Sequence, residues 1–516
     1  MLFSALLTLV PLIVVLALLL VFKLAADIAG LLGLLVTLFL AIFYFDTAWQ
    51  IMPQVLLAGF IGSLPVGLVI ATSIFQITIM AESGALARII ALIKTLTPHD
   101  KAVQVLLINV GIGILLTGLG AASFAIFPPI LLALGYNISA AILLPAIGYV
   151  ALCMYALLGI PAIIMAHFAD ANLMDAGLIL ASYMPYISTA VAFACLYIVG
   201  GFKLMRQGFI PAILAGLSSG FIAIALTKAG LITVIAIIAG IAIIIALLIY
   251  VKLRGGIIQD RSILTEKDLA AEQKFSLIRA SSPWLVLLVL SLIINTPALP
   301  FFDLTFKKLA MPLDIIPNQP ENLRLFWQAY FWVFVSTLIC LPFLKVTKMQ
   351  LFARNGILIK GILRSWRAIG ATAVYFCIAY VMNHSGKLAD WQIVADHNMI
   401  LILAKEATAI FATYYPTATP FLGLIAGFIG GSASSSVAMF TKLHIAAGTH
   451  LNISPLTLVA ANGIGGGLAS AISPSKLFGA AISIDKPQAV NTVMIKAFTI
   501  TTLLTALCAI LTQYWV

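Results

Sequence analysis

The sequence predicts an all-α, polytopic membrane protein with about ten to fourteen transmembrane helices, built as two halves that each contain a broken helix or re-entrant hairpin. Of the 516 residues, 63% are hydrophobic and only 9% are charged, whereas charged residues make up about 25% of a soluble domain. Runs such as residues 231–251 are apolar on every face. This excludes an outer-membrane barrel, because barrel strands alternate apolar and polar side chains. Glycine and serine clusters interrupt apolar runs in both halves, and they predict the broken helices.

The positive charge indicates topology. The chain has 28 Lys and Arg against 17 Asp and Glu, which gives a net charge of +11. Basic residues of membrane proteins gather in cytoplasmic loops, so this excess does not predict a nucleic-acid partner. We therefore expect a first transmembrane half at 1–251, a cytoplasmic charged loop at 252–282 and a second transmembrane half at 283–516. The basic segment 345–367 should lie inside, either against anionic membrane lipid or as a solvated linker.

The apolar runs predict the spans in order. Residues 1–22 lack a basic start and a small-residue cleavage site, so we expect a retained first helix. Further spans are expected at 25–45, 54–80, 104–134, 138–168, 176–201, 208–226, 229–251, 283–296 and 326–344.

A count of crossings predicts where one run breaks. Basic residues at 88–101 and at 203–206 should both be cytoplasmic, yet three apolar runs lie between them. One of these runs must therefore enter and leave on the same side of the membrane. The stretch from Gly118 to Ser123, followed by Pro128 and Pro129, is the expected break, because glycine frees the backbone and proline ends helices. We place the first hairpin at about 107–133, where the non-helical backbone would be buried or line a cavity.

A matching arrangement recurs in the second half. Asn-Ile-Ser at 137–139 precedes a small-residue run ending in Gly-Ile-Pro at 159–161, and Asn-Ile-Ser at 452–454 precedes one ending in Ile-Ser-Pro at 472–474. A Gly/Ser cluster lies upstream of each run, the second at 430–436. Paired interruptions of this kind point to the binding site of a secondary transporter, so a second hairpin is expected at about 417–442.

A helix that stops inside the membrane can bind an anion. It presents unpaired backbone N–H groups and the positive end of its dipole. The alternative is that the small residues only allow close helix packing. The candidate substrate-binding residues are Gly118, Gly120, Ser123, Gly431, Ser432, Ser434, Ser435, Ser436, Asn462, Ser473 and Lys476.

Ionisable residues inside apolar runs are candidates for coupling an ion to transport. Lys405 and Glu406 are the coupling candidates, and an interfacial pair is the alternative. Lys476 could hold a substrate carboxylate or extend to the membrane surface. His444 could titrate near neutral pH, but a position at the membrane edge is expected for it and for Lys442.

Several chemistries find no support in the sequence. The glycine-rich stretch 463–467 lacks the Gly-Lys-Ser/Thr ending of a phosphate loop. The five cysteines have no paired spacing, and no His/Cys/Asp cluster has metal-ligand spacing. We expect no metal, no cofactor and no enzyme activity.

Several segments in this order resemble the L-lactate permease family of bacterial secondary transporters: Leu96-Thr97-Pro98, Asn383-His384-Ser385-Gly386, the serine cluster 431–436, Val459 to Asn462, and Ile472-Ser473-Pro474. The resemblance implies uptake of lactate and related 2-hydroxy monocarboxylates such as glycolate together with protons. It also implies an ion-transporter-like fold of two inverted repeats, each with a re-entrant hairpin. Three positions depart from the family pattern: Thr117 replaces a Glu, Ala433 an Asp and Ser470 a Lys.

The predicted function is a secondary active transporter of the bacterial inner membrane, with its amino terminus outside, that imports a small monocarboxylate on a proton gradient. Its partners would be the organic anion, a proton or sodium ion and membrane lipid, with no nucleic acid and a possible homo-oligomer. One alternative is a sodium-coupled carrier of a different organic anion on the same fold. Another is a membrane subunit of a proton-translocating redox complex, which needs a chain of buried Lys and Glu; only Lys405 and Glu406 approach this pattern.

Overall fold

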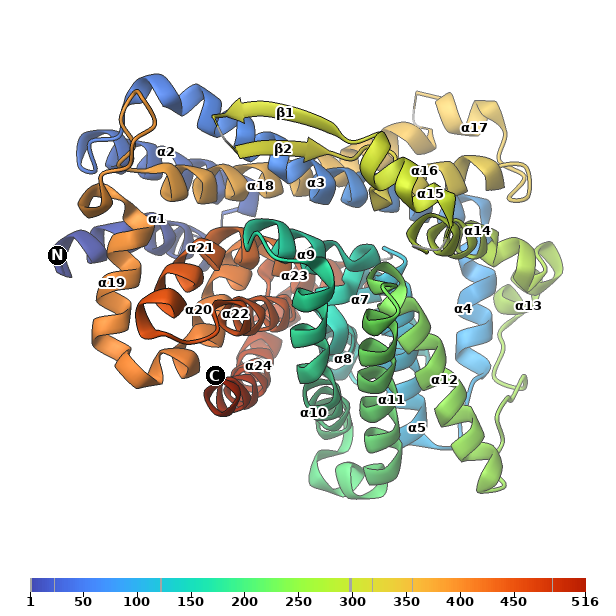
Figure 1. Ribbon diagram of the computed structural model, residues 1–516. Coiled ribbons are helices and arrows are strands. Elements are labelled where there is room, and N and C mark those ends of the chain that lie inside the picture. The colour runs from blue at the N-terminus through green and yellow to red at the C-terminus, as the bar shows by residue number, and fades with distance from the viewer. Residues whose placement is uncertain are drawn as a thin grey trace.

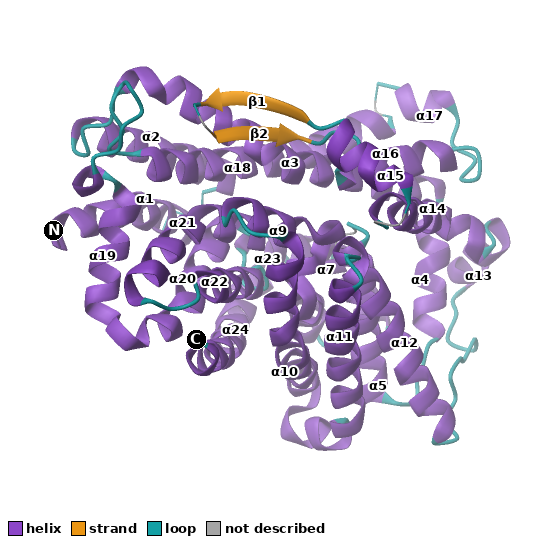
Figure 2. Ribbon diagram, in the orientation of Figure 1, coloured by secondary structure: helices purple, strands orange, loops and turns teal. Residues whose placement is uncertain are grey.

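The protein is built almost entirely from helices (Figures 1 and 2). The structure, a computed structural model, describes residues 2–22, 24–120, 123–296, 299–317, 319–354, 356–484 and 486–516. Among these residues, nine helices are long and apolar enough to cross a membrane, and four shorter apolar helices accompany them. The prediction of an all-α polytopic membrane protein is confirmed.

A layer of long helices forms one side of the molecule. Helices α2, α3 and α18 run side by side across the top of Figure 1, and α18 packs against both others. Glycines on α3 allow this close approach: a Cβ on Gly59 would lie 3.0 Å from the Cα of Cys377 on α18. The first elements are α1 (Leu2–Leu20), α2 (Ala26–Phe43), α3 (Met52–Ser83) and α4 (Ala85–Thr95), and α18 spans Ile357–His384.

Below this layer the chain forms a second group of helices, in which α10, α11 and α12 run steeply downward in Figure 1. Helix α10 packs on α11, and α11 packs on α12. The elements are α5 (Lys101–Leu106), a π-helical turn (Leu107–Ile112), α6 (Gly113–Gly118), α7 (Ser123–Ala133), α8 (Ile138–Gly148), a 3-10 segment (Tyr149–Tyr155), α9 (Ala156–Phe168), α10 (Leu173–Gln207), α11 (Phe209–Lys228), a 3-10 turn (Ile232–Val234) and α12 (Ile235–Leu253).

The expected charged loop after α12 contains a short helix that is attached to α4. Helix α13 (Glu266–Lys274) begins with a capping box at Thr265. The Lys94 ammonium lies 2.9 Å from the Asp268 carboxylate, and Arg88 lies 3.1 Å from Glu272. Burial opposes ionisation of Asp268, but hydrogen bonds from Lys94 and Thr265 and the Lys94 charge outweigh it, so the pKa of Asp268 is lowered.

The chain then returns to the top layer. A two-stranded antiparallel ribbon pairs Met311 with Leu323 and Ile316 with Gln319, and it lies above α18 and α3 in Figure 2. The elements are α14 (Leu277–Asn295), α15 (Pro300–Phe302), a π-helical turn (Asp303–Lys308), β1 (Met311–Ile316), β2 (Gln319–Leu323), α16 (Ala329–Cys340) and α17 (Lys348–Phe352). The basic segment 345–367 therefore divides between α17 and the first turns of α18.

The remaining helices form a third group, at the lower left of Figure 1. They are α19 (Met399–Phe411), α20 (Tyr415–Gly430), α21 (Ala433–Leu451), α22 (Pro455–Ala469), α23 (Pro474–Ile482) and α24 (Val490–Trp515). Helices α20 and α22 touch through their backbones, because a Cβ on Gly423 would overlap the carbonyl of Asn462 and one on Gly427 would overlap that of Gly466. Small residues therefore do serve close packing here, as the alternative interpretation held.

Candidate functional site

The first expected interruption is present in the structure. Helix α6 ends at Gly118, Gly120 adopts the left-handed conformation with φ +85°, and α7 begins at Ser123. The Ser123 hydroxyl is buried and lies 3.3 Å from the hydroxyl of Thr117. Pro128 and Pro129 do not form the break, contrary to our prediction, since both lie inside α7. The conformational freedom of glycine is what stops this helix.

A serine that the sequence analysis missed lies at this first break. A Cβ on Gly120 would overlap the hydroxyl of Ser73 on α3 and would lie 3.6 Å from the Leu157 side chain. Ser73 is 3% exposed, and its hydroxyl has no hydrogen-bond partner among the described residues. A single serine in a long apolar helix gives no local signal, so only the fold identifies it as part of the site.

The second expected interruption lies between α20 and α21. Gly431 adopts the left-handed conformation with φ +66°, and Ser432 caps α21 by accepting a hydrogen bond from the Ser435 amide at 3.2 Å. The hydroxyls of Ser432 and Ser435 are 2.7 Å apart, and Ser434 is 2% exposed. The amides of Ala433 and Ser434 belong to the first turn of α21, where backbone N–H groups have no acceptor within the helix.

Ser436 and Asn462 connect three helices next to this second break. The Ser436 hydroxyl donates to the Gly423 carbonyl on α20 at 3.1 Å, and the Asn462 amide on α22 donates to the Ser436 carbonyl at 3.2 Å. Both side chains are fully buried. Their polar atoms hold α20, α21 and α22 together.

Two further helices are interrupted beside the two breaks. Leu157, Leu158 and Gly159 all have positive φ angles, which separates α8 and its 3-10 extension from the main part of α9. In the second half, residues 470–473 separate α22 from α23. Our count of crossings required one broken run, but the structure interrupts both 104–134 and 138–168.

Lys476 lies in the first turn of α23 and contacts the interrupted helix of the first half. Its ammonium donates a hydrogen bond to the Tyr149 hydroxyl at 2.8 Å, and that hydroxyl lies 2.8 Å from the Ser470 hydroxyl. In the part of the chain that the structure describes, no carboxylate forms an ion pair with Lys476. Tyr149, like Ser73, was not among the residues predicted from sequence.

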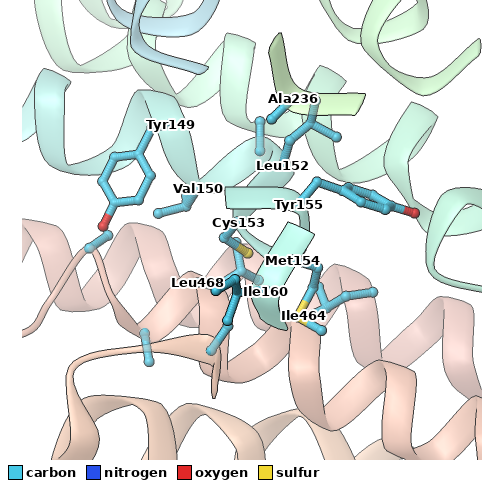
Figure 3. Close-up of a cluster of buried hydrophobic side chains, with 14 of the residues drawn as sticks. Tyr149, Val150, Leu152, Cys153, Met154, Tyr155, Ile160, Ala236, Ile464 and Leu468 are labelled. Atoms are coloured by element: carbon cyan, nitrogen blue, oxygen red, sulfur yellow. The ribbon is translucent and has the colours of Figure 1, made fainter. Parts of the chain in front are cut away.

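These segments meet around α22. A Cβ on Gly467 would overlap the sulfur of Cys153 and would lie 3.6 Å from Ala433, so both the first-half interruption and the second break touch this helix. Figure 3 shows the 3-10 segment with Cys153 and Met154 against Ile464 and Leu468 of α22. The first break joins this region through α7, because the Phe124 ring lies 3.3 Å from a Cβ on Gly479 of α23.

The coupling candidates Lys405 and Glu406 lie apart from these contacts. Both are on α19, where Lys405 is exposed and Glu406 is half-buried. Neither forms a hydrogen bond or ion pair with a residue of the two breaks, within the described residues. His444 is buried among the helices, because its side chain is 0% exposed.

A multi-pass helical fold with interrupted helices meeting around buried hydroxyls and a lysine defines a membrane transporter. The sequence model of the family described as L-lactate permease matches residues 4–516. The chain belongs to the L-lactate permease family.

Individual relatives support this assignment. The glycolate permease GlcA of Escherichia coli K12 is 25% identical, over 92% of this chain and 89% of that protein. An L-lactate permease of Halalkalibacterium halodurans is 25% identical over the same shares, and one of Salmonella typhi is 23% identical over 84% of this chain and 82% of its own. A solved structure, the YdaH transporter of Alcanivorax borkumensis, aligns with a TM-score of 0.43 at 13% identity, covering 89% of this chain and 87% of that chain. Because the relatives are permeases, the expectation of a transporter in place of an enzyme is confirmed.

Proposed function

We propose that the protein imports a small 2-hydroxy monocarboxylate of the lactate and glycolate class across a bacterial inner membrane, driven by a proton gradient. The observation that carries this proposal is Lys476, a cation without a paired carboxylate among the described residues, next to an interrupted helix. A lysine in this position attracts a monovalent organic anion, because an opposite charge would relieve the cost of burying the ammonium.

The surrounding groups suit a hydroxy acid. The carboxylate would bind Lys476 and the unpaired amides at the start of α21, where the helix dipole adds to the attraction. The hydroxyls of Ser434 and Ser123 can donate to or accept from the 2-hydroxyl group. Gly120 and Gly431 would let a ligand this small approach the backbone.

Lys476 also offers an explanation for one departure from the family pattern. Where the resemblance places a Lys, this chain has Ser470, and the Tyr149 hydroxyl joins Ser470 to Lys476 by two hydrogen bonds. The positive charge would thus be supplied from α23 to the same place.

Movement would follow the division of the chain that the sequence predicts. We propose that 1–251 and 283–516 are inverted repeats joined through 252–282. The two hairpins and their neighbouring interrupted helices would move together against the layer formed by α2, α3 and α18. The site would thereby open to each side of the membrane in turn.

Sodium coupling is the alternative, and a specific observation favours it. Thr117, Ala433 and Ser470 are neutral where the family pattern has ionisable residues. Backbone carbonyls released by an interrupted helix can hold a sodium ion without any acidic side chain. The anion carried in that case could differ from lactate.

Uptake by the purified protein in proteoliposomes tests both proposals. Labelled L-lactate, glycolate and pyruvate are offered with an imposed proton gradient or an imposed sodium gradient. We expect lactate accumulation that follows the proton gradient, and accumulation that follows only sodium would favour the alternative. The variant Lys476→Met should raise the KM for lactate at least tenfold, while Lys442→Met, which removes a surface ion pair with Asp170, should leave it unchanged. An unchanged KM in Lys476→Met would refute the assigned role.

A further inference from the structure

His444 is a fully buried histidine with one free ring nitrogen. It lies on α21, eight residues beyond Ser436, and is 0% exposed. Its Nδ1 lies 2.9 Å from the hydroxyl of Tyr415 on α20, which is also 0% exposed. Its Nε2 is buried and has no hydrogen-bond partner within the part of the chain that the structure describes. A buried polar atom without a partner is destabilising, so its presence calls for a functional explanation.

Asn462 carries a hydrogen-bond acceptor that can pair with a protonated His444. Its side chain on α22 is close enough to interact with the His444 ring. Within the described residues, the Asn462 Oδ1 receives a single long hydrogen bond of 3.4 Å from Ser436, whose hydroxyl donates at a shorter distance, 3.1 Å, to the Gly423 carbonyl. An amide oxygen accepts two hydrogen bonds, so Oδ1 can accept one more.

We propose that His444 is the proton-binding residue that couples the proton gradient to substrate binding at the α20–α21 break, an inference that rests on the proposed function. One proton forms an N–H bond at the free ring nitrogen, and the ring becomes a cation that donates from both nitrogens. Nδ1–H donates to the Tyr415 oxygen, and Nε2–H donates to Asn462 Oδ1. The proton comes from a hydronium ion, whose O–H bond breaks to leave a water molecule as the N–H bond forms, and it leaves by the reverse step.

Asn462 would transmit the change to the substrate site. Its Nδ2 donates to the Ser436 carbonyl, in the first turns of the helix whose start faces the proposed anion site. When Oδ1 turns toward a protonated His444, Nδ2 must turn with it, because both atoms belong to one planar amide. The hydrogen bonds that hold the start of α21 against α20 and α22 then change with the protonation state.

Among the described residues of α21 and the helices packed against it, Glu406 on α19 is the one acidic residue, and it forms no ion pair with His444. Neither an ion pair nor a hydrogen bond to a carboxylate is found for its ring within the described residues. The elements packed against α21 are α9, α18, α19, α20 and α22. Besides His444, the ionisable groups are Lys442 and His450 on α21, His167 on α9, Lys405 and Glu406 on α19, and Tyr415 on α20. Helix α18 carries Lys360, Arg364, Arg367, Tyr375, Cys377, Tyr380 and His384. Lys442 is already paired with Asp170, and Lys405 is exposed.

A bound substrate anion would supply the missing charge. His444 lies ten residues beyond Ser434, whose amide belongs to the proposed anion site, and ten helical residues span about 15 Å. Opposite charges this far apart at an effective dielectric constant of about 20 favour each other by about sixfold. By linkage, lactate binding would raise the proton affinity of His444 about sixfold, and protonation would raise lactate affinity by the same factor. Proton and anion would therefore bind together and leave together.

Transport assays on a matched pair of histidine variants test the proposal. His444→Gln removes the titrating group, while His450→Gln alters an exposed histidine on the same helix. In proteoliposomes we expect His444→Gln to exchange labelled for unlabelled L-lactate within about twofold of the unmutated rate, but to lose accumulation driven by a proton gradient. His450→Gln should behave like the unmutated protein in both assays.

Each other outcome overturns a defined statement. Normal accumulation by His444→Gln refutes the coupling role of His444 and leaves the proposed function intact. Loss of accumulation in Glu406→Gln alone, with His444→Gln unaffected, moves the coupling to α19. Absence of any lactate or glycolate uptake by the unmutated protein refutes the proposed function, and the coupling role with it.

A spectroscopic measurement keeps the test decisive if His444→Gln does not fold. The ¹⁵N chemical shifts of the ring nitrogens report protonation, and the His444 signal is assigned as the one that remains when the other five histidines are replaced by glutamine. We expect its midpoint to rise by about 0.8 pH unit on adding saturating L-lactate, which corresponds to the sixfold coupling. A His444 ring that remains neutral from pH 5 to pH 8 with lactate present refutes the proposal.

Discussion

Alanine at Gly120 should destabilise the first break in two separable ways. The φ angle of +85° places any L side chain in the left-handed region, where the strain is about 1–2 kcal/mol. The new methyl group would also overlap the Ser73 hydroxyl and lie 3.2 Å from the Ser73 Cβ, and such overpacking typically destabilises by about 1–3 kcal/mol. We therefore expect Gly120→Ala to lower the free energy of unfolding by about 2–5 kcal/mol.

Gly135 provides a matched control for this prediction. It has a similar φ of +80°, but a Cβ there would meet nothing within 4 Å. Gly135→Ala should therefore show the backbone strain alone, about 1–2 kcal/mol. Adding Ser73→Ala to Gly120→Ala should remove most of the difference between the two glycine variants, because the overlapping hydroxyl is gone.

Reversible unfolding in detergent, followed by tryptophan fluorescence, gives the free energy of unfolding of the unmutated protein, the two glycine variants and the double variant. The reasoning fails if Gly120→Ala is no less stable than Gly135→Ala. It also fails if Ser73→Ala further destabilises the Gly120→Ala protein.

Three further predictions concern other contacts. Asp268→Asn should reduce the stability of the purified protein by about 1.5–3 kcal/mol. Because the pKa of Asp268 is lowered in the folded state, this contribution is present above about pH 4 and is lost as the pH falls from the unfolded pKa through the lowered folded pKa. Equal unfolding temperatures for both proteins at pH 7 would contradict this prediction. Tyr149→Phe removes the hydroxyl that joins Lys476 to Ser470 and should raise the KM for L-lactate uptake about fivefold, whereas an unchanged KM would exclude this role. Gly427→Ala should lower stability by about 1–3 kcal/mol through overlap with the α22 backbone, and an unfolding temperature equal to that of the unmutated protein would argue against this contact.

The interruptions that could be predicted from sequence are those with a local cause. Glycine and serine occupy the breaks at Gly120 and Gly431, and the conformational preferences of these residues act wherever the chain is placed. The break in α9 has no such cause, since Leu157 and Leu158 rarely adopt positive φ. In this conformation Gly159 packs against the backbone of Ile232 and Thr233, which would lie within 3.3 Å of a Cβ on Gly159. That contact joins residues too distant in sequence for a local pattern to reveal.

The site residues divide in the same way. The serine cluster was recognisable because several small polar residues occur together in an apolar chain. Ser73, Tyr149 and His444 are single polar residues in apolar runs, and their importance depends on partners in other helices. The contact of His444 with Tyr415 could not be predicted from the sequence, because it joins two different helices.

The backbone contact between α20 and α22 limits how this part of the protein can rearrange. Contacts at Gly423, Gly427 and Gly465 leave no layer of side chains between the two helices. Flexible side chains between two helices can change rotamer and let the helices slide past each other, but the backbones of α20 and α22 are in direct contact. We therefore expect α20 and α22 to move together as one rigid unit. A path for a solute would then open at the surfaces where this unit meets other helices.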